Sequence, residues 1–335
     1  MAAKGGPEPA GAAHDSDGVR QLVTGYQAAR ALLAADEIGL LDHLDGTPQS
    51  VAALAAATET HEPSLARFLR ALAAVGLVTL KADGRVDRGP LADGLRDAAR
   101  IGVENYRAWC ELPYSLRSGK PAFDRVFGMG FYRYLDSAPE RAARFNEALA
   151  AVSRGWIDGV LAALDFDDDT VVADVGGGHG SFIAALLRRH PELHGILIDR
   201  PAVLARAEAV LTAAEVADRC RLVAMNFLEA VPAGISTATL CNLLTDWDDA
   251  RATAILKNCR AALDKDGRLL VVDRVLPPPD DPGHRAAAFL DLFFLVLEGG
   301  CIRSRAEFET LFETAGFRLL RSVPVGGGFH ALEGR

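Results

Sequence analysis

The fold is decided by one stretch of the sequence, Val171-Val172-Ala173-Asp174-Val175-Gly176-Gly177-Gly178-His179-Gly180. Its first half is an apolar run with the length of a buried strand, and the residues after Gly180 have helical periodicity as far as Arg189. Glycines between a strand and a helix let the backbone turn sharply and let a ligand lie against the main chain. The amino end of the helix favours negative charge. The stretch therefore predicts a strand, a ligand-binding turn and a helix.

The next predicted strand adds an acid to this turn. Ile196-Leu197-Ile198 ends at Asp199, about 20 residues beyond the glycines, where a carboxylate can accept hydrogen bonds from a ribose diol. The glycines follow Asp174 with the spacing G-x-G-x-G, whereas dinucleotide sites have G-x-G-x-x-G. This pattern indicates a nucleoside cofactor and looks like that of methyltransferases that use S-adenosylmethionine. A tight turn with a purely structural role is the alternative, and it does not account for Asp199.

Strands and helices alternate through the rest of the chain. The first strand-like runs are 171–175, 195–199, 221–225 and 238–243. Such alternation predicts an α/β fold, a Rossmann-like, doubly wound and mostly parallel sheet with helices on both faces. We assign residues 166–335 to this domain, which would bind the cofactor.

A small helical domain is predicted on the amino side. Residues 1–18 have almost no large apolar side chains, so we expect a disordered tail. Helical periodicity extends from Val19 to Leu44, two shorter helices follow, and residues 77–87 predict a hairpin. Helix, helix and hairpin are the pattern of a winged helix. DNA binding is one alternative, but Lys and Arg are scarce where a recognition helix needs them, so dimerisation or coverage of the substrate is favoured for residues 19–100.

Residues 101–165 predict further helices that join the two domains, and many of the aromatic residues are concentrated there. A helical core is one explanation, and the wall of a pocket for a flat organic ligand is the other. We interpret the segment as a helical linker and pocket segment. The substrate-pocket residues predicted here and in the later helix around 289–297 are Trp109, Phe123, Phe131, Leu149, Asp291, Phe294 and Leu295.

The composition of the chain excludes several classes of binding partner. The 335 residues are 50% hydrophobic with a formal net charge of −9, so the chain can bury a large core, and the charge has the wrong sign for a surface that holds phosphate backbones. No run approaches the roughly 20 apolar residues of a membrane span, and no secretory signal is recognisable. The five cysteines form no CxxC pair, so neither disulfides nor a metal site is predicted. We expect a cytoplasmic protein with no nucleic-acid or membrane partner.

The ordered motifs of the chain resemble those of the small-molecule O-methyltransferases of plants and bacteria, which join a winged-helix dimerisation domain to a methyltransferase domain. The resemblance covers residues 19–333. The matching motifs are Asp174-Val175-Gly176-Gly177-Gly178 with Gly180, His190-Pro191, Asp199 with Pro201, Asp246-Trp247-Asp248-Asp249, Ile255-Leu256-Lys257-Asn258-Cys259, Asp291-Leu292, Gly299-Gly300, Arg303-Ser304, Glu307-Phe308 and Ala315-Gly316-Phe317.

This resemblance implies a homodimer, S-adenosylmethionine as cofactor and a small-molecule substrate. Gly176 and Gly178 would approach the amino-acid part of the cofactor, Asp199 would hold the ribose, and Ser153 would meet the carboxylate. The residues assigned to the cofactor are Ser153, Asp174, Gly176, Gly177, Gly178, Asp199, Asn226, Phe227, Cys241 and Trp247.

Three departures from the family pattern concern the site. Asn226 stands where the family usually has an acid for the adenine amine, and its carbonyl oxygen can still accept from that amine. Cys241 replaces a frequent Lys or Arg, which predicts weaker cofactor binding. Thr245 replaces the histidine that takes the proton from the substrate hydroxyl, and threonine is no base near neutral pH. Of the two acids that orient this histidine in plant members, one matches Asp273 and the other falls on Ile302.

The catalytic positions are therefore Thr245, Asp273 and Asp246, with Thr245 expected to be a small, uncharged wall of the pocket. His179, His284 and His330 are alternative bases, as is Asp246. Each of them also has an ordinary structural interpretation.

The favoured function is S-adenosylmethionine-dependent methyl transfer to a hydroxyl of an aromatic or polyketide-like secondary metabolite. A general base contributes about 10²–10⁴-fold and alignment of the reactants about 7–11 kcal/mol, so O-methylation by proximity can proceed without the histidine. C- or N-methylation is an alternative. Because the histidine and one acid are lost, non-methylating chemistry such as hydroxylation, decarboxylation or a pericyclic step is another, and a DNA-binding regulator is a third.

Overall fold

The computed structural model describes residues 16–98 and 102–335, and the chain divides after Tyr106 into two compact units. Each unit has its own hydrophobic core. Of the predicted disordered tail, residues 1–15 lie outside the described residues. The prediction is wrong for residues 16–18, because they open the first helix.

The first unit is helical with one hairpin, as the sequence predicts. The expected helix from Val19 to Leu44 is divided, since α2 ends before Gly39, which takes the left-handed conformation (φ +63°). Side chains of α2 to α4, such as Leu54 and Leu69, pack with hairpin residues into a leucine-rich core. The elements are α1 (Ser16–Thr24), α2 (Tyr26–Glu37), η1 (Leu40–His43), α3 (Val51–Ala57), α4 (Glu62–Ala74), β1 (Val78–Leu80), β2 (Val86–Arg88) and α5 (Ala92–Ala98).

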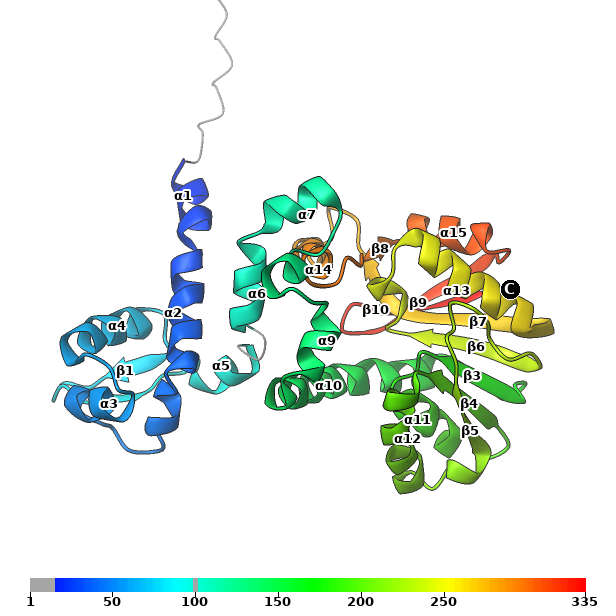
Figure 1. The fold of residues 1–335 in the computed structure, drawn as a ribbon, viewed down its shortest axis with the longest axis horizontal. Helices are drawn as coiled ribbons and strands as arrows, with labels where there is room; N and C mark the ends of the chain where they lie inside the picture. The colour runs from blue at the N-terminus through cyan, green and yellow to red at the C-terminus, as the bar shows by residue number, and fades with distance from the viewer. Residues whose placement is uncertain (1–15, 99–101) are drawn as a thin grey trace, which may run out of the picture. The chain divides into compact units, whose positions relative to one another are not determined.

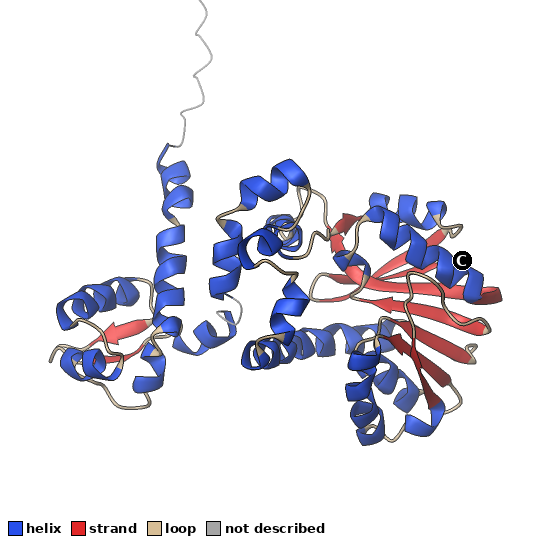
Figure 2. Cartoon of the chain, in the orientation of Figure 1, coloured by secondary structure: helices blue, strands red, loops and turns tan. Residues whose placement is uncertain are grey.

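The second unit begins with short helices and continues as an alternation of strands and helices (Figure 2). The helical elements that precede the sheet are α6 (Gly102–Trp109), whose first turns fall in the first unit, α7 (Leu112–Ser118), α8 (Ala122–Phe127), α9 (Phe131–Asp136) and α10 (Pro139–Ala163). The elements that follow are β3 (Val171–Val175), α11 (Ser181–Arg189), β4 (His194–Asp199), α12 (Pro201–Ala213), η2 (Ala217–Arg219), β5 (Cys220–Ala224), β6 (Ile235–Cys241), η3 (Leu244–Asp246), α13 (Asp249–Ala262), β7 (Leu263–Leu276), α14 (His284–Leu297), β8 (Arg303–Ser304), α15 (Arg305–Thr314), β9 (Leu319–Gly326) and β10 (Phe329–Gly334).

The sheet has the order β5-β4-β3-β6-β7-β10-β9, and the strands from β5 to β7 are parallel. β10 runs antiparallel to both of its neighbours. Successive residues of β3 enter opposite cores: Val172 packs with α10 to α12, whereas Ala173 packs with α13 and α15. Helices therefore cover both faces, and the predicted doubly wound α/β fold is confirmed (Figure 1). The strand order reverses between β3 and β6, which is where such sheets bind ligands.

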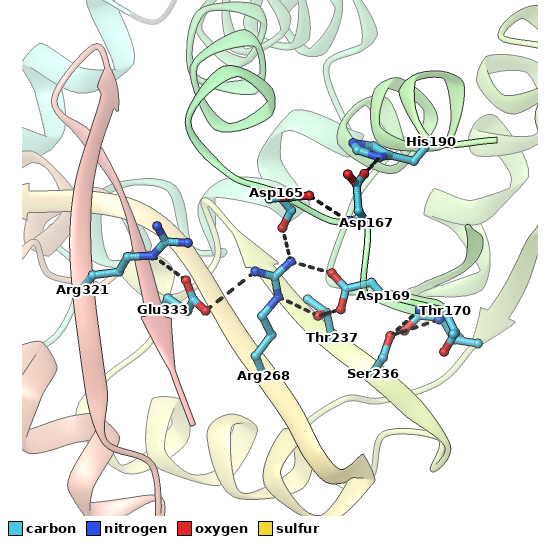
Figure 3. Close-up of polar contacts among 11 residues, drawn as sticks. Asp165, Asp167, Asp169, Thr170, His190, Ser236, Thr237, Arg268, Arg321 and Glu333 are labelled. Carbon is cyan, nitrogen blue, oxygen red and sulfur yellow. Dashed lines mark hydrogen bonds and ion pairs between the residues drawn. The ribbon is translucent and has the colours of Figure 1, made fainter. Parts of the chain in front are cut away.

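The amino ends of the strands carry a network of ion pairs (Figure 3). The Arg268 guanidinium lies between the carboxylates of Asp169 and Glu333 and also donates to the Thr237 hydroxyl at 3.1 Å. Arg321 Nε donates to the second oxygen of Glu333 at 2.6 Å. Each buried carboxylate at this edge thus has a guanidinium beside it.

Candidate active site

The glycine turn leaves β3 at the carboxyl edge of the sheet. The Gly176 N–H donates to the Ile198 carbonyl at 2.7 Å, which ties the turn to β4. A Cβ at Gly177 would lie 2.2 Å from Asp174 Oδ2, so no larger residue fits there. Gly178 has φ +61°, and nothing lies within 4 Å of where its Cβ would be. The turn needs glycine at both positions and leaves open space beside its backbone.

Asp199 fixes this turn from the end of β4. Its Oδ2 accepts from the Gly178 N–H at 3.0 Å, and its Oδ1 accepts from the Arg200 N–H at 2.7 Å. Each carboxylate oxygen keeps a lone pair for a further donor. The arrangement can accept hydrogen bonds from the two hydroxyls of a ribose.

A pocket of about 180 Å³ lies against the glycine turn. Six of the predicted cofactor residues share it, together with Trp156 and Asn242, which the sequence pattern does not predict. The lining is Ser153, Trp156, Ile157, Asp174, Gly176, Gly177, Gly178, His179, Ser181, Phe182, Cys241 and Asn242.

Two buried polar atoms of this lining, Asp174 Oδ2 and Trp156 Nε1, have no hydrogen-bond partner within the described chain. The first is an acceptor and the second a donor. The ammonium of an amino acid needs an acceptor, and its carboxylate needs a donor. The pocket therefore fits the amino-acid part of S-adenosylmethionine.

Asp174 is fully buried, and this burial raises the pKa of its carboxyl to about 7. The nearby charge of Asp199 raises that pKa further, while a hydrogen bond of 3.0 Å from the Thr239 hydroxyl lowers it. A cationic group bound beside Asp174 would stabilise the ionised carboxylate.

The residues predicted to hold the adenine lie on the turn after β5. Asn226 Nδ2 donates to Glu229 at 2.7 Å, and its Oδ1 accepts from the Leu228 N–H at 3.2 Å. The side chain therefore braces its own turn, with one lone pair of Oδ1 left for an adenine amine. The ring of Phe227 meets that of Trp247 edge to face, with centroids 6.1 Å apart.

Thr245 and Asp273 are in direct contact beneath the end of β6. The Thr245 hydroxyl donates to Asp273 Oδ1, and the Thr245 N–H donates to Oδ2 at 3.0 Å. Burial raises the pKa of the Asp273 carboxyl, while these hydrogen bonds and the Arg274 N–H oppose the rise. The one proton of the Thr245 hydroxyl is thus committed to Asp273.

The turn at 244–247 is also held from the other side, by the segment that follows α14. Arg303 donates to the carbonyls of Leu244 and Trp247 at 2.8 and 2.7 Å, and the Cys301 N–H donates to the Thr245 carbonyl at 2.9 Å. A Cβ at Gly300 would lie 2.0 Å from that carbonyl oxygen. The sequence pattern does not predict this role of Arg303, although its position in a family motif marks it.

Asp246 has two polar neighbours, Tyr132 and Glu298. The Tyr132 hydroxyl donates to Asp246 Oδ2 at 3.2 Å, and the carboxyls of Asp246 and Glu298 are close enough to interact. Burial raises the pKa of Asp246 to about 6 and that of Glu298 well above its usual range. Neither Tyr132 nor Glu298 is predicted from the sequence. An acid at the end of an apolar helix, directly before Gly299-Gly300, is the signal that marks Glu298.

Two of the alternative histidines contact other polar groups, and the third lies in the cofactor pocket. His284 Nδ1 is 2.7 Å from the Pro277 carbonyl, and His330 Nδ1 is 2.9 Å from the Ser322 hydroxyl. Burial lowers the pKa of His330. His179 lines the cofactor pocket beside the glycine turn.

The predicted substrate wall is partly an aromatic cluster of α8 and α9. Phe123 stacks on Phe127 with ring centroids 4.3 Å apart and meets Phe131 edge to face at 5.3 Å. Asp291 on α14 accepts from the Ile302 N–H at 2.6 Å, so it braces the loop beyond its helix. The other predicted residues are Phe294, Leu295 and Trp109, which are half-buried, and Leu149, whose side chain lies outside the described residues.

Comparison with known proteins agrees with this geometry. Residues 109–318 match the O-methyltransferase domain, and residues 20–95 match the O-methyltransferase dimerisation domain. The chain is 38% identical to a phenazine O-methyltransferase of Lysobacter antibioticus, over 97% of this chain and 98% of the relative. Further relatives are named as N-methyltransferases.

Solved structures give the same result. The mitomycin 7-O-methyltransferase MmcR superposes with a TM-score of 0.85 at 35% identity, covering 95% of this chain and 97% of that one. An O-methyltransferase from neocarzinostatin biosynthesis, solved with S-adenosylmethionine and 2-hydroxy-5-methyl naphthoic acid, has a TM-score of 0.79 at 29% identity, with 91% and 95% coverage. The chain belongs to the O-methyltransferase family and is an S-adenosylmethionine-dependent methyltransferase of secondary metabolism.

Proposed function

We propose that the protein methylates a hydroxyl on the ring of a small aromatic secondary metabolite. The observation that carries this proposal is the hydrogen bond from Tyr132 to Asp246, because it fixes the aromatic helix α9 against the turn at the end of β6. A flat acceptor held among the rings of α8 and α9 would lie beside the cofactor pocket. The phenazine O-methyltransferase and the neocarzinostatin enzyme solved with a hydroxynaphthoic acid, whose names include flat aromatic rings, support the same substrate class.

When bound, the cofactor supplies an electrophilic methyl group. Asp199 would hold its ribose, Asp174 and Trp156 would hold its amino-acid part, and Phe227 with Trp247 would flank the adenine. The chain's own contribution is then alignment: the glycine turn and the turn at 244–247 fix the two reactants relative to each other. Alignment of this kind contributes about 7–11 kcal/mol.

The protein would act as a cytoplasmic homodimer. The support is the dimerisation-domain match and a row of exposed apolar residues on α1 and the start of α2, since such a row is costly to leave in water. These residues are Val19, Leu22, Val23 and Tyr26.

The test is a panel of phenols, hydroxynaphthoates, hydroxyphenazines and their amino analogues, incubated with cofactor that carries a ¹³C-methyl group. Mass spectrometry with fragmentation locates the label. We expect labelled methyl ethers from hydroxylated rings and no turnover of the same rings without a hydroxyl. Label on nitrogen or carbon would replace O-methylation by the corresponding reaction, and a product without label would overturn methyl transfer.

A further inference from the structure

Two carboxyl groups lie side by side next to the position where the family has its histidine. Asp246 is the last residue of η3, one residue after Thr245, and Glu298 is the residue that caps the carboxyl end of α14. The two carboxyls are close enough to interact directly, and Glu298 Oε2 is buried without a partner within the described chain. The guanidinium of Arg303, which packs on this turn, is committed to Asp249 and to the carbonyls of Leu244 and Trp247.

Two neighbouring carboxyls that hydrogen-bond to each other hold one proton between them, because two adjacent buried negative charges repel strongly. The pair titrates as a unit. Burial, then the charge of the partner, raises the pKa of Glu298 well above its usual range, while the pKa of Asp246 is raised to about 6, with Asp273 adding to the rise. Near neutral pH the pair therefore carries one negative charge and can receive one more proton.

The pair is connected to the aromatic wall by one hydroxyl. Tyr132 on α9 donates to Asp246 Oδ2, and the tyrosine residue as a whole is 44% exposed. The charged groups that act on this hydroxyl are Asp246, Glu298 and Arg200. Burial raises the pKa of Tyr132 well above its usual range, so it remains a neutral hydroxyl that can donate to one group and accept from another.

Thr245 cannot supply the missing base. Its hydroxyl proton is donated to Asp273, and its backbone N–H is donated to the same carboxylate. The carboxyl group nearest in sequence that forms no ion pair among the described residues is that of Asp246.

We propose that the Asp246–Glu298 pair, reached through the Tyr132 hydroxyl, takes the proton from the hydroxyl of the methyl acceptor. This inference rests on the proposed function. The acceptor oxygen forms the new C–O bond as the C–S bond of the sulfonium breaks, with its electron pair left on sulfur. The acceptor's proton passes to the Tyr132 oxygen while the tyrosine's own proton passes to Asp246 Oδ2. Tyr132 ends as it began, and the pair becomes neutral.

The deciding experiment compares Asp246→Asn, Glu298→Gln and Tyr132→Phe with the wild type in single-turnover methylation at saturating cofactor. The acceptors are two phenols of one ring system that the wild type methylates, one with an ordinary phenolic pKa and one made acidic by a ring nitro group. For the ordinary phenol we expect Asp246→Asn to lower the rate 10²–10⁴-fold, the range for loss of a general base. For the nitrophenol, already ionised at pH 8, we expect a loss within about tenfold.

Glu298→Gln should change the pH profile of kcat/KM, which a purely structural role of Glu298 would leave unchanged. An amide is a weaker donor to Asp246 than a carboxyl that shares its proton, so the pKa of Asp246 should rise and the acidic limb of the kcat/KM pH profile should move to higher pH. A matched acid-to-amide change at the exposed Glu313 on α15 should leave rate and profile unchanged. Thermal melting and cofactor affinity of every variant separate loss of chemistry from loss of fold.

Carboxyl ¹³C NMR of the cofactor-free protein gives a second test that needs no turnover. The wild type should show Asp246 and Glu298 titrating together, with one proton retained well above pH 5, and this coupled step should vanish in either amide variant. Two independent titrations below pH 5 would overturn the inference. Equal losses of Asp246→Asn on both phenols, or a wild-type rate for Tyr132→Phe, would also overturn it. A wild type that methylates none of the panel would instead refute the proposed function, and the inference with it.

Discussion

Buried acids at the two edges of the central sheet have different kinds of partner. At the amino edge, Asp169 and Glu333 share the guanidinium of Arg268, and Arg321 adds a second cation to Glu333 (Figure 3). At the carboxyl edge, Asp174 has an oxygen without a partner among the described residues, and Asp246 lies beside another acid, Glu298. Acids that are fully paired within the chain stabilise the fold, whereas acids left incomplete cost stability and can bind a ligand or a proton. The comparison therefore distinguishes Asp174 and Asp246 from the ion-paired acids of the amino edge without a bound ligand.

The largest expected effect is on stability, at the amino edge. Arg268→Met leaves two buried carboxylates without their shared cation, which should lower the free energy of unfolding by about 3–5 kcal/mol. Cofactor affinity should not change. Urea unfolding and calorimetry measure the two quantities. Arg305→Met, which removes an exposed pair with Glu309, is the control and should cost less than about 1 kcal/mol. A matching loss of cofactor affinity in Arg268→Met would mean that the edges are coupled.

At the carboxyl edge the next effect is on binding. Asp199→Ala removes a charged acceptor that also holds the Gly178 N–H, so cofactor affinity should fall about 10- to 100-fold. Isothermal titration with S-adenosylmethionine measures it. Asp167→Ala is the matched change at the amino edge, where the carboxylate is 79% exposed, and it should leave affinity unaltered. Unchanged affinity in Asp199→Ala would refute the assignment of the ribose.

A further effect at the carboxyl edge is a pH-dependent cost in stability that Asp174 causes. Its folded-state pKa of about 7 lies above the ordinary 3.8, so the folded protein keeps a proton that the unfolded chain has released between these values. The stability of the cofactor-free protein should therefore fall as pH rises towards 7. Asp174→Asn removes this cost, and at pH 8 it should raise stability by up to about 4 kcal/mol, at 1.4 kcal/mol per pKa unit.

The same substitution should have the opposite effect on the cofactor. Wild-type affinity for S-adenosylmethionine should increase between pH 6 and 8, because the carboxylate forms and meets the ammonium. The affinity of Asp174→Asn should be lower at pH 8 and flat across this range. Melting curves and titration calorimetry at pH 6, 7 and 8 check both parts. A wild-type affinity that does not vary with pH would show that Asp174 does not face a cation.

The smallest effect is expected at Thr245. Thr245→Ala removes one hydrogen bond to Asp273, worth about 0.5–1.5 kcal/mol, so the single-turnover rate should stay within about tenfold of the wild type. Thr245→Ser retains the hydroxyl and serves as the control. A loss of several hundredfold with cofactor binding intact would mean that Thr245 itself takes part in the chemistry.

The doubly wound sheet is predictable from the sequence because strand-like runs and helical segments alternate without interruption after Val171. The glycine turn and Asp199 are predictable for the same reason: their spacing is local. The lengths of the helices and strands are less predictable from the sequence. The apolar, strand-like part of β7 is only Leu269–Val272, yet the strand extends from Leu263 to Leu276, because pairing with β6 and β8 orders residues that lack a strand pattern of their own.

Contacts between distant segments could not be predicted in this way. Tyr132 and Asp246 are 114 residues apart, and only the packing of α9 over the turn after β6 brings their oxygens together. Glu298 belongs to a helix end whose apolar pattern gives no partner for it. Trp156 enters the cofactor pocket from α10, a helix that the sequence marks as aromatic without indicating which ring faces the ligand.

The turn at 244–247 is held through its backbone, and this leaves its side chains free to change during evolution. Arg303 and Cys301 hold carbonyl oxygens of the turn, and Gly300 lies against its main chain, so none of them depends on which side chains the turn carries. Substitutions at 245 and 246 can therefore replace one set of proton-accepting side chains with another, while the backbone of the turn keeps its position. Evolution, or a designer reinstalling an imidazole, can alter the reactivity of this site without redesigning the scaffold that supports it.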